Sequence, residues 1–259
     1  MSQAAFPATI SPPPRREKRP RKRVTRADVL EERKRSFLRL VSHELRTPLN
    51  SILGFSQILA GELYGPLGSP QYREYAEIIR GSGQKLLKLV NQVLEIARLE
   101  TQAHAFESSP EPLEAAIDEV VGAMGEDLAA RGVTVRILGR GRMPLVMADA
   151  WGLRTVLANL LQNALVFSPE GGEVRVRANV QGASVEVSIE DDGEGVDAAE
   201  LPRLLLPFEQ GENALVRRAE GAGLGLPICD LTCRAMGGRL KLSSPPGQGL
   251  TARVRLKRG

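Results

Sequence analysis

Two long amphipathic segments, separated by a short glycine-rich break, constrain the fold of this chain more than any other feature. The first runs from about Asp28 to Ala60 and the second from Ser69 to Leu99, and both repeat apolar residues at helical spacing. Three glycines and a proline within residues 61–68 predict a short connection between them. Because a lone hairpin would leave its wide apolar stripe in water, we expect two hairpins to pair as the four-helix bundle of a homodimer.

Local signals indicate where these helices begin and bend. Thr25-Arg26-Ala27-Asp28 has the pattern of a capping box, so the first helix should start there. Ser69 and Pro70 suit the N-cap and the first helical position of the second helix. Pro48 removes a backbone donor from the first helix and predicts a bend just after His43.

His43 is the most informative single residue. It lies in the segment Ser-His-Glu-Leu-Arg-Thr-Pro-Leu, residues 42–49, beside the carboxylate of Glu44 and one turn before Thr47. An exposed histidine that is paired with a base at a helix bend suits a phosphoryl acceptor better than a core position. His104, the other histidine of the chain, falls in a polar stretch and is expected to be a solvated loop residue.

The net charge of +4 arises largely in residues 15–26, which hold eight basic residues against Glu17 alone. This proline-bearing segment is either a disordered, solvated tail or an electrostatic anchor to anionic lipid, nucleic acid or an acidic partner. No aromatic residue interleaves the charges, so we do not expect nucleic acid as a partner. The chain has no apolar run near the roughly 18 residues that span a bilayer, and no signal peptide opens it. We therefore expect a cytoplasmic protein without a transmembrane segment.

From Leu113 onward the pattern changes to a mixture of helices and strands, which predicts a two-layer α+β sandwich. Asp149 is placed to cap one of its helices. The expected helices cover residues 113–128, 149–167 and 224–236, and the expected strands cover residues 133–138, 173–180, 185–190, 239–242 and 251–256. The chain is therefore expected to be multi-domain, with a disordered tail (1–26), an all-α hairpin (27–103), a linker (104–112) and an α/β domain (113–259).

Two glycine-containing segments of the second domain carry candidate chemistry. Asp191-Asp192-Gly193-Glu194-Gly195 directly follows a strand, although such a sequence is also typical of a tight turn. Gly221, Gly223 and Gly225 precede a helix, where missing side chains would let phosphates reach backbone N–H groups. Pro-Phe-Glu-Gln at residues 207–210 opens the polar stretch between these segments, which suits a mobile lid.

Two pairs of residues recur at one-turn spacing on predicted helices. Asn159 and Asn163 share a helix face, and their amide oxygens are hard ligands suited to Mg²⁺, whereas either one alone would indicate a surface or capping residue. Cys229 and Cys233 lie among apolar residues with no histidine nearby. We expect these cysteines to be two small buried hydrophobes rather than a zinc or redox site.

The motifs SHELRTPL, NLLQNA, DDGEG, PFEQ and GAGLGL, in this order, resemble the H, N, G1, F and G2 boxes of bacterial two-component sensor histidine kinases. The resemblance covers about Asp28 to Leu256, and segments near Tyr64, Tyr72 and Arg217 are similar to the PleC/DivJ-type subgroup. It implies a dimerisation and histidine phosphotransfer hairpin, followed by a catalytic ATP-binding domain of the GHKL type that DNA gyrase and MutL share.

By motif position, the resemblance makes His43 the phosphoryl acceptor and Glu44 the base that takes its ring proton. The group would pass to an aspartate in the receiver domain of a separate response regulator. Glu44 and Thr47 also match an E-x-x-T pattern, which in the family positions water to hydrolyse the regulator's phosphoaspartate. A phosphatase activity towards the regulator is thus a second implied activity.

ATP and Mg²⁺ are the implied cofactors. Asn163 would hold Mg²⁺, Asp191 would accept a hydrogen bond from the adenine amino group, and an arginine of the lid could reach the γ-phosphate. The implied nucleotide site comprises Asn159, Asn163, Asp191, Gly193, Gly195, Phe208, Arg217, Arg218, Gly221, Gly223, Leu224 and Gly225.

The sequence departs from the family pattern at several points. Val166 stands where a basic residue is common, Leu205 replaces the first aromatic of the F box, and Leu250 stands where threonine commonly follows the closing Gly-x-Gly. These changes would lower ATP affinity or turnover. No sensor domain precedes the hairpin in this sequence, so we also expect a separate sensor or regulatory protein as a partner.

Two other functions account for part of the pattern. A non-catalytic dimeric scaffold or phosphotransfer adaptor would fit Val166 and the missing sensor, but it would not need intact G1 and G2 motifs. A nucleic-acid-binding ATPase of the gyrase kind would fit the basic tail, but it would leave His43 and the hairpin without a role. An active histidine kinase accounts for all of these features.

Overall fold

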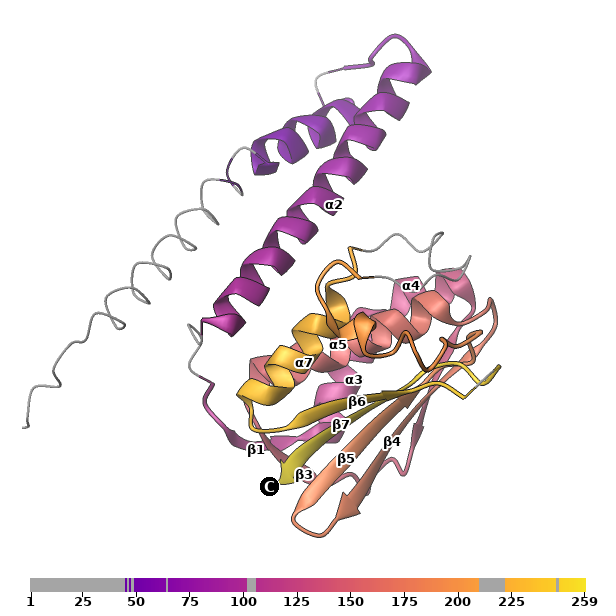
Figure 1. Cartoon of the computed structure of the whole chain (residues 1–259). Helices are drawn as coiled ribbons and strands as arrows, with labels where there is room; N and C mark the ends of the chain where they lie inside the picture. Colours follow the sequence, from indigo (N-terminus) through magenta and orange to yellow (C-terminus); the bar gives the residue numbers. More distant parts are fainter. Residues whose placement is uncertain are drawn as a thin grey trace, which may run out of the picture.

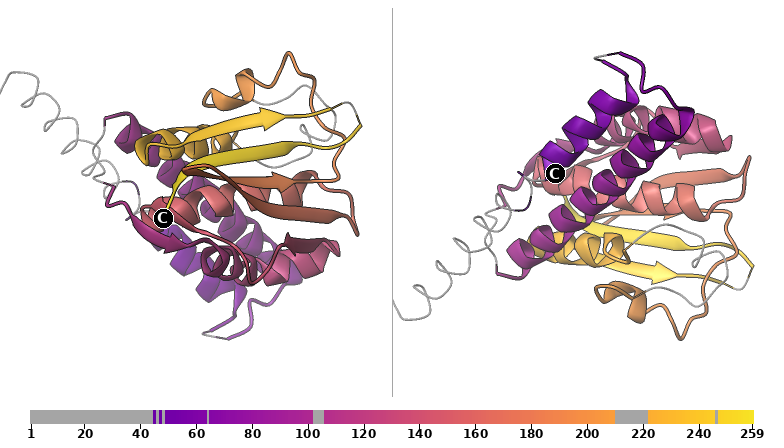
Figure 2. Two further views of the ribbon diagram at one scale, coloured as in Figure 1. Left: turned by 90° about the horizontal axis from the view of Figure 1, so that it is seen from below. Right: turned by 90° about the horizontal axis from the view of Figure 1, so that it is seen from above.

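Two helices lie side by side at the start of the described chain (Figures 1 and 2). The computed structural model describes residues 45, 47, 49–63, 65–101, 106–209, 222–245 and 247–259. Residues 49–60 form the first helix and α2 (Pro70–Glu100) the second, as the sequence predicts. A Cβ atom on Gly83 would lie 3.0 Å from Leu53 Cδ2, so the lack of a side chain at this position of α2 lets Leu53 of the first helix pack closely against it.

The start of α2 follows the sequence signals in part. Ser69 occupies the N-cap with an extended backbone, and Pro70 is the first helical residue. The Ser69 side chain does not cap the helix, because its Oγ donates instead to Gln71 Oε1. The capping box at Thr25 and the bend expected near Pro48 lie outside the described residues.

A seven-stranded sheet with helices on one face forms the second domain (Figure 1). The strand order is β1-β3-β7-β5-β4-β2, and β6 also pairs with β7; the β2–β4 pair is parallel and the others are antiparallel. The strands are β1 (Ser109–Pro112), β2 (Thr134–Leu138), β3 (Leu145–Ala148), β4 (Glu173–Gln181), β5 (Ser184–Glu190), β6 (Arg239–Ser243) and β7 (Thr251–Arg258). The helices are α3 (Leu113–Ala123), α4 (Gly125–Arg131), α5 (Ala150–Phe167) and α7 (Gly225–Ala235), with a 3₁₀ turn, η1, at Arg203–Leu205. A helical hairpin followed by a two-layer sandwich confirms the expected fold class.

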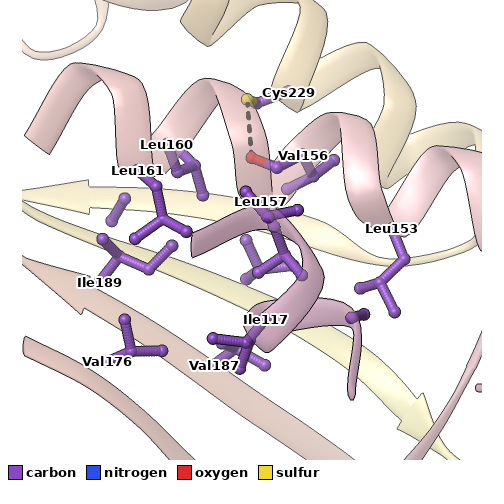
Figure 3. Packing of buried hydrophobic residues seen from close by; sticks show 14 of the residues in the cluster. Ile117, Leu153, Val156, Leu157, Leu160, Leu161, Val176, Val187, Ile189 and Cys229 are labelled. Carbon is purple, nitrogen blue, oxygen red and sulfur yellow. Dashed lines mark hydrogen bonds between the residues drawn. The ribbon is translucent and has the colours of Figure 1, made fainter. Parts of the chain in front are cut away.

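The core lies between α5 and the sheet. Leucines from one face of α5 point at the alternating apolar residues of β4 and β5, and Ile117 of α3 closes one side (Figure 3). Burying one such side chain contributes about 1.5–3 kcal/mol. The facing residues are Leu153, Leu157 and Leu161 from the helix and Val176, Val187 and Ile189 from the strands.

Cys229 and Cys233 belong to this core as free thiols. The Cys229 Sγ donates to the carbonyl oxygen of Val156, 3.7 Å away, which ties α7 to α5 (Figure 3). Burial raises the pKa of Cys233 to about 12 and raises the pKa of Cys229 well above its ordinary value. Neither thiol is readily ionised, so both behave as the small buried hydrophobes that their apolar neighbours predict.

Three details differ from the sequence-based expectation. The expected linker ends in β1, a four-residue edge strand that tolerates Pro110 and Pro112 because one side of an edge needs no donor. Its partner β3 was not predicted at all, because four residues are too few for a clear alternation. The helix expected over residues 113–128 divides at Met124, between Gly122 and Gly125, which are poor helix formers.

The C-terminal end of α2 packs against the second domain. Ile96 and Leu99 form a small buried cluster with Leu224 and Ile228, at and just inside the start of α7. The two parts of the chain therefore share an apolar contact next to the segment that carries the G2 motif. No helix within the described ranges is long and apolar enough to cross a membrane.

Candidate functional site

Asp191 is the most buried carboxylate of the expected site. It follows β5, is 4% exposed, and its Oδ1 accepts hydrogen bonds from the backbone N–H groups of Gly193 (2.9 Å) and Leu250 (3.1 Å). Desolvation raises the pKa of Asp191 above its ordinary value, and the two backbone hydrogen bonds oppose that rise. Both bonds use Oδ1, and no group within the described ranges hydrogen-bonds the second oxygen, which is therefore available to a donor on a ligand.

Glycines surround this carboxylate where other residues would collide with it. A Cβ atom on Gly193 would lie 2.7 Å from Asp191 Oδ1 and 2.7 Å from the carbonyl oxygen of Phe167, the last residue of α5. A Cβ atom on Gly249 would lie 2.0 Å from the carbonyl oxygen of Asp191. The loop after β5 is thus pressed against the end of α5 on one side and against the turn before β7 on the other.

Ser244 and Gly249 were missed by the sequence reasoning. The Ser244 Oγ accepts a hydrogen bond from the Val196 N–H (2.7 Å) and donates to the Gly249 carbonyl oxygen (2.7 Å). Gly195, at φ 80°, leaves room for this hydroxyl, because a Cβ atom there would lie 2.6 Å from it. The closing Gly-x-Gly was visible in the sequence, but its contact with the Asp191 loop was not.

Arg175 is a second residue that the sequence did not single out. From β4 it forms ion pairs with Asp192 (2.8 Å), Glu190 (3.6 Å) and Glu173 (3.6 Å). Its hydrogen bond to Asp192 is the main cause that raises the pKa of Arg175. Asp192 also accepts the backbone N–H of Glu173 at 3.1 Å. These contacts fix the start of the glycine loop to the neighbouring strand.

Asn159 and Asn163 lie half-buried on the face of α5 that meets the start of α7. A Cβ atom on Gly225, the first residue of α7, would lie 3.3 Å from Asn159 Oδ1 and 3.7 Å from the Asn163 side-chain amide. Asn159 donates its Nδ2 to the Thr155 carbonyl oxygen (2.8 Å), which turns its Oδ1 outward from the helix backbone. The structure therefore brings both asparagines to the glycine-rich start of α7. Val166 follows on α5, about one turn after Asn163 and about two turns after Asn159.

The asparagines suit a hard cation that arrives with a ligand. Within the described ranges, no protein group hydrogen-bonds the Asn163 amide, so its oxygen is available, and half-burial limits competition from water. No group of three His, Cys, Asp or Glu residues in that part of the chain could hold a metal by itself. Amide oxygens and ligand oxygens together are a donor set that Mg²⁺ accepts.

The two ends of the expected lid meet. Gly223, at φ 66°, comes so near Glu209 that a Cβ atom would lie 2.5 Å from the Glu209 carbonyl oxygen. Phe208, also at positive φ, is 64% exposed, whereas Leu224 is buried in the contact with α2. Leu205 in η1 packs against the core, so aliphatic packing fills the place of the missing aromatic. Arg217, Arg218 and Gly221 lie outside the described residues.

The expected acceptor segment is only partly described. His43 and Glu44 lie outside the described residues, whereas Thr47 is helical and exposed. Leu49 is 6% exposed and begins the buried side of the same helix.

Comparisons with known proteins also find two domains in the chain. Residues 33–102 match the His Kinase A (phospho-acceptor) domain, and residues 148–259 match the histidine kinase-, DNA gyrase B- and HSP90-like ATPase. The chain is 37% identical over 230 residues to the "Non-motile and phage-resistance protein" of Caulobacter vibrioides, which covers 87% of this chain and 27% of that protein. It is 34% identical over 237 residues to the "Cell-division control histidine kinase PdhS" of Brucella suis, covering 88% of this chain and 23% of that protein.

Among solved structures, full-length ShkA in complex with AMPPNP superposes with a TM-score of 0.73 at 32% identity, covering 86% of this chain and 46% of ShkA. The Acinetobacter baumannii histidine kinase AdeS shares the fold, with a TM-score of 0.58 at 19% identity over 83% of this chain and 97% of AdeS. This chain spans about a quarter of the length of the curated relatives named above.

Proposed function

Because this chain belongs to the histidine kinases, we propose that it is an ATP-dependent autokinase that phosphorylates His43 and passes the phosphoryl group to a response regulator. The observation that carries the proposal is the convergence of three segments on one site. The Asp191 loop abuts the end of α5, and the start of α7 abuts Asn159 and Asn163. Each contact depends on a glycine. The backbone N–H groups at the start of α7 and the side-chain amides of Asn159 and Asn163 therefore border the same space.

The nucleotide is assigned to this space by chemistry. The free oxygen of Asp191 suits the adenine amino group, which is a donor, whereas guanine presents an oxygen at that ring position. The N–H groups at the start of α7 suit the phosphates, since a helix N-terminus carries a partial positive charge. Asn163 would hold Mg²⁺, which would screen the charge that develops on the phosphates.

The proposed transfer uses groups from both domains. The neutral imidazole of His43 attacks the γ-phosphorus, the bond to the β–γ bridging oxygen breaks, and ADP leaves. The Glu44 carboxylate takes the proton that the ring loses. The phosphoryl group then moves to an aspartate of a receiver domain, and hydrolysis of that phosphoaspartate, aided by Glu44 and Thr47, is proposed as a second activity.

A homodimer is proposed from the apolar surface of the helical part. Several large apolar side chains are exposed along residues 49–60 and α2, and a surface of this extent on a monomer marks an association site. These side chains are Ile52, Phe55, Leu59, Tyr72, Tyr75, Ile78, Ile79, Leu86 and Val93.

Incubation of the purified chain with γ-labelled ATP and Mg²⁺ tests the central assignment. We expect label that is lost in acid and kept in alkali, as for a phosphoramidate. The label should be absent from His43→Ala and present in His104→Ala, which removes the other histidine of the chain. Equal labelling of the two variants would refute His43 as the acceptor.

A further inference from the structure

The face of the sheet that points away from the described helices is strongly basic. The helices pack on one face, and in Figure 2, left, the strands lie in front of them with their other face open. Along β7, Ala252, Val254 and Leu256 are buried in the core, so the alternate residues Arg253, Arg255 and Lys257 belong to the open face. By the same alternation, β4 contributes Arg177 and β6 contributes Arg239 and Lys241.

The strand register gathers these cations into rows. Arg177, Ser188, Arg253 and Lys241 stand directly opposite one another across β4, β5, β7 and β6. In the next row Arg255 lies between Glu186 and Arg239. We call this set the basic sheet face: Arg177, Arg239, Lys241, Arg253, Arg255 and Lys257.

Few anions balance the basic sheet face. Glu186 is the one carboxylate within its rows, while Glu190 and Asp192 are already engaged by Arg175. Five of the six cations are exposed, and Arg253 is half-buried with its guanidinium on Ser243 Oγ (2.6 Å). None of the six forms an ion pair with another residue of the described ranges. The pairs Lys241/Arg253 and Arg239/Arg255 place cations on neighbouring strands, which lie about 4.8 Å apart and repel one another, so a polyanion would stabilise this face.

We infer that the basic sheet face docks the protein onto an anionic lipid bilayer. The face is broad and spans four strands, which matches a planar layer of headgroups better than the curved backbone of a duplex. Its rows contain no aromatic residue on which bases could stack.

Docking in this orientation leaves the candidate nucleotide site open. Asn159, Asn163 and the start of α7 belong to the helical layer, on the other side of the sheet from the basic face. A bilayer on the basic face would therefore not cover these residues. The inference stands independently of the proposed kinase activity, because it rests on surface charge alone.

Co-sedimentation of the full chain with vesicles tests the inference. We expect binding to phosphatidylcholine vesicles that contain about a third phosphatidylserine, release at high salt, and no binding to pure phosphatidylcholine. The double variant Lys241→Gln/Arg255→Gln should bind roughly 30-fold more weakly, since each basic residue near the surface contributes a factor of about five to the affinity. Its thermal midpoint should be no lower than that of the unchanged chain, because two repulsive pairs are relieved, and its nucleotide affinity should be unaltered.

Lys88→Gln/Arg142→Gln is the matched control, because both residues are exposed and the variant loses the same charge elsewhere. It should bind vesicles like the unchanged chain. Equal binding by the two double variants would overturn the inference and leave any membrane contact to residues 15–26. Binding to duplex DNA that the sheet variant alone loses, without vesicle binding, would also overturn it and identify nucleic acid as the occupant.

Discussion

The backbone N–H of Leu250 donates a 3.1 Å hydrogen bond to Asp191 Oδ1, joining the loop after β5 to the turn before β7. The side chain at position 250 takes no part in this bond. The leucine that departs from the family pattern therefore leaves the support of Asp191 intact. What the bond requires is a glycine at position 249, where the two backbones meet.

Gly249→Ala should disrupt the nucleotide site, because its Cβ would lie 2.0 Å from the Asp191 carbonyl oxygen. Gly247→Ala is the control, since it has the same positive φ (70° against 71°) but no atom within 4 Å of its Cβ. Both variants should lose about 1 kcal/mol of stability from the left-handed backbone. Only Gly249→Ala should lose more than tenfold in ATP affinity by calorimetric titration, and equal affinities would argue against this wall of the site.

Asp191→Asn should weaken ATP binding by about 10- to 100-fold, the value of a hydrogen bond to a charged group. The side-chain amide of the introduced asparagine must direct its NH₂ group either at the N–H groups of Gly193 and Leu250 or at the adenine amino group. In either orientation one donor faces another donor. Asp197→Asn, an exposed change six residues on, should bind ATP normally. Unchanged affinity in Asp191→Asn would remove this residue from the site.

Val166→Lys should raise ATP affinity by about tenfold, because a cation on this face of α5 would add a charge-assisted contact to a phosphate. Val180→Lys makes the same change at a 47% exposed position near the end of β4 and should leave affinity unaltered. A decrease in Val166→Lys would indicate that Val166 packs against the bound nucleotide.

Glu95→Gln should stabilise the contact between α2 and α7. Glu95 Oε1 is buried with no hydrogen-bond partner in the described ranges, and its charge contributes to the raised pKa of Cys229 across the contact. Desolvation raises the pKa of Glu95, although nearby Arg98 opposes the rise. Folding therefore favours the protonated form of Glu95. The free energy of unfolding decreases as the pH rises from the ordinary glutamate pKa, about 4.3, through the raised pKa of Glu95 in the folded protein.

The thermal midpoint of Glu95→Gln should consequently exceed that of the unchanged chain at pH 8, and the gap should shrink as the pH falls below 5. Glu100→Gln, an exposed change on the same helix, should show no such pH dependence. A constant gap at every pH would mean that the charge of Glu95 is not the cause.

Thr47→Ala should slow dephosphorylation of a phosphorylated receiver domain by at least tenfold and leave autophosphorylation unchanged. Thr47 is exposed on its helix, where its hydroxyl can orient a water molecule. Ser51→Ala removes the next hydroxyl along the same exposed side and is the control. Equal losses of autophosphorylation and dephosphorylation would point to helix damage instead.

Long elements with strong local signals were predictable from the sequence. The α5 helix begins as its cap predicts, with Asp149 Oδ1 accepting the Gly152 N–H at 2.8 Å. Strands β4 and β5 alternate strictly over seven or more residues, and both lie where the alternation places them. In contrast, β1 and β3 are four residues each, and their pairing is decided by tertiary contacts that no local pattern encodes.

The same distinction applies to the candidate site. Asn159, Asn163 and Asp191 were found because motif spacing marks them, and the structure brings their segments together. Arg175 and Ser244 were missed because their roles depend on partners far along the chain, Asp192 and Val196. A lone arginine on a strand carries no sequence signal for such a contact.

Peptide mapping of the phosphorylated chain, kept at alkaline pH after incubation with ATP and Mg²⁺, tests the central claim most directly. The account predicts one phosphorylated peptide, the one that contains His43. Phosphate on a serine, threonine or other residue, or none at all in a chain that binds ATP, would contradict it.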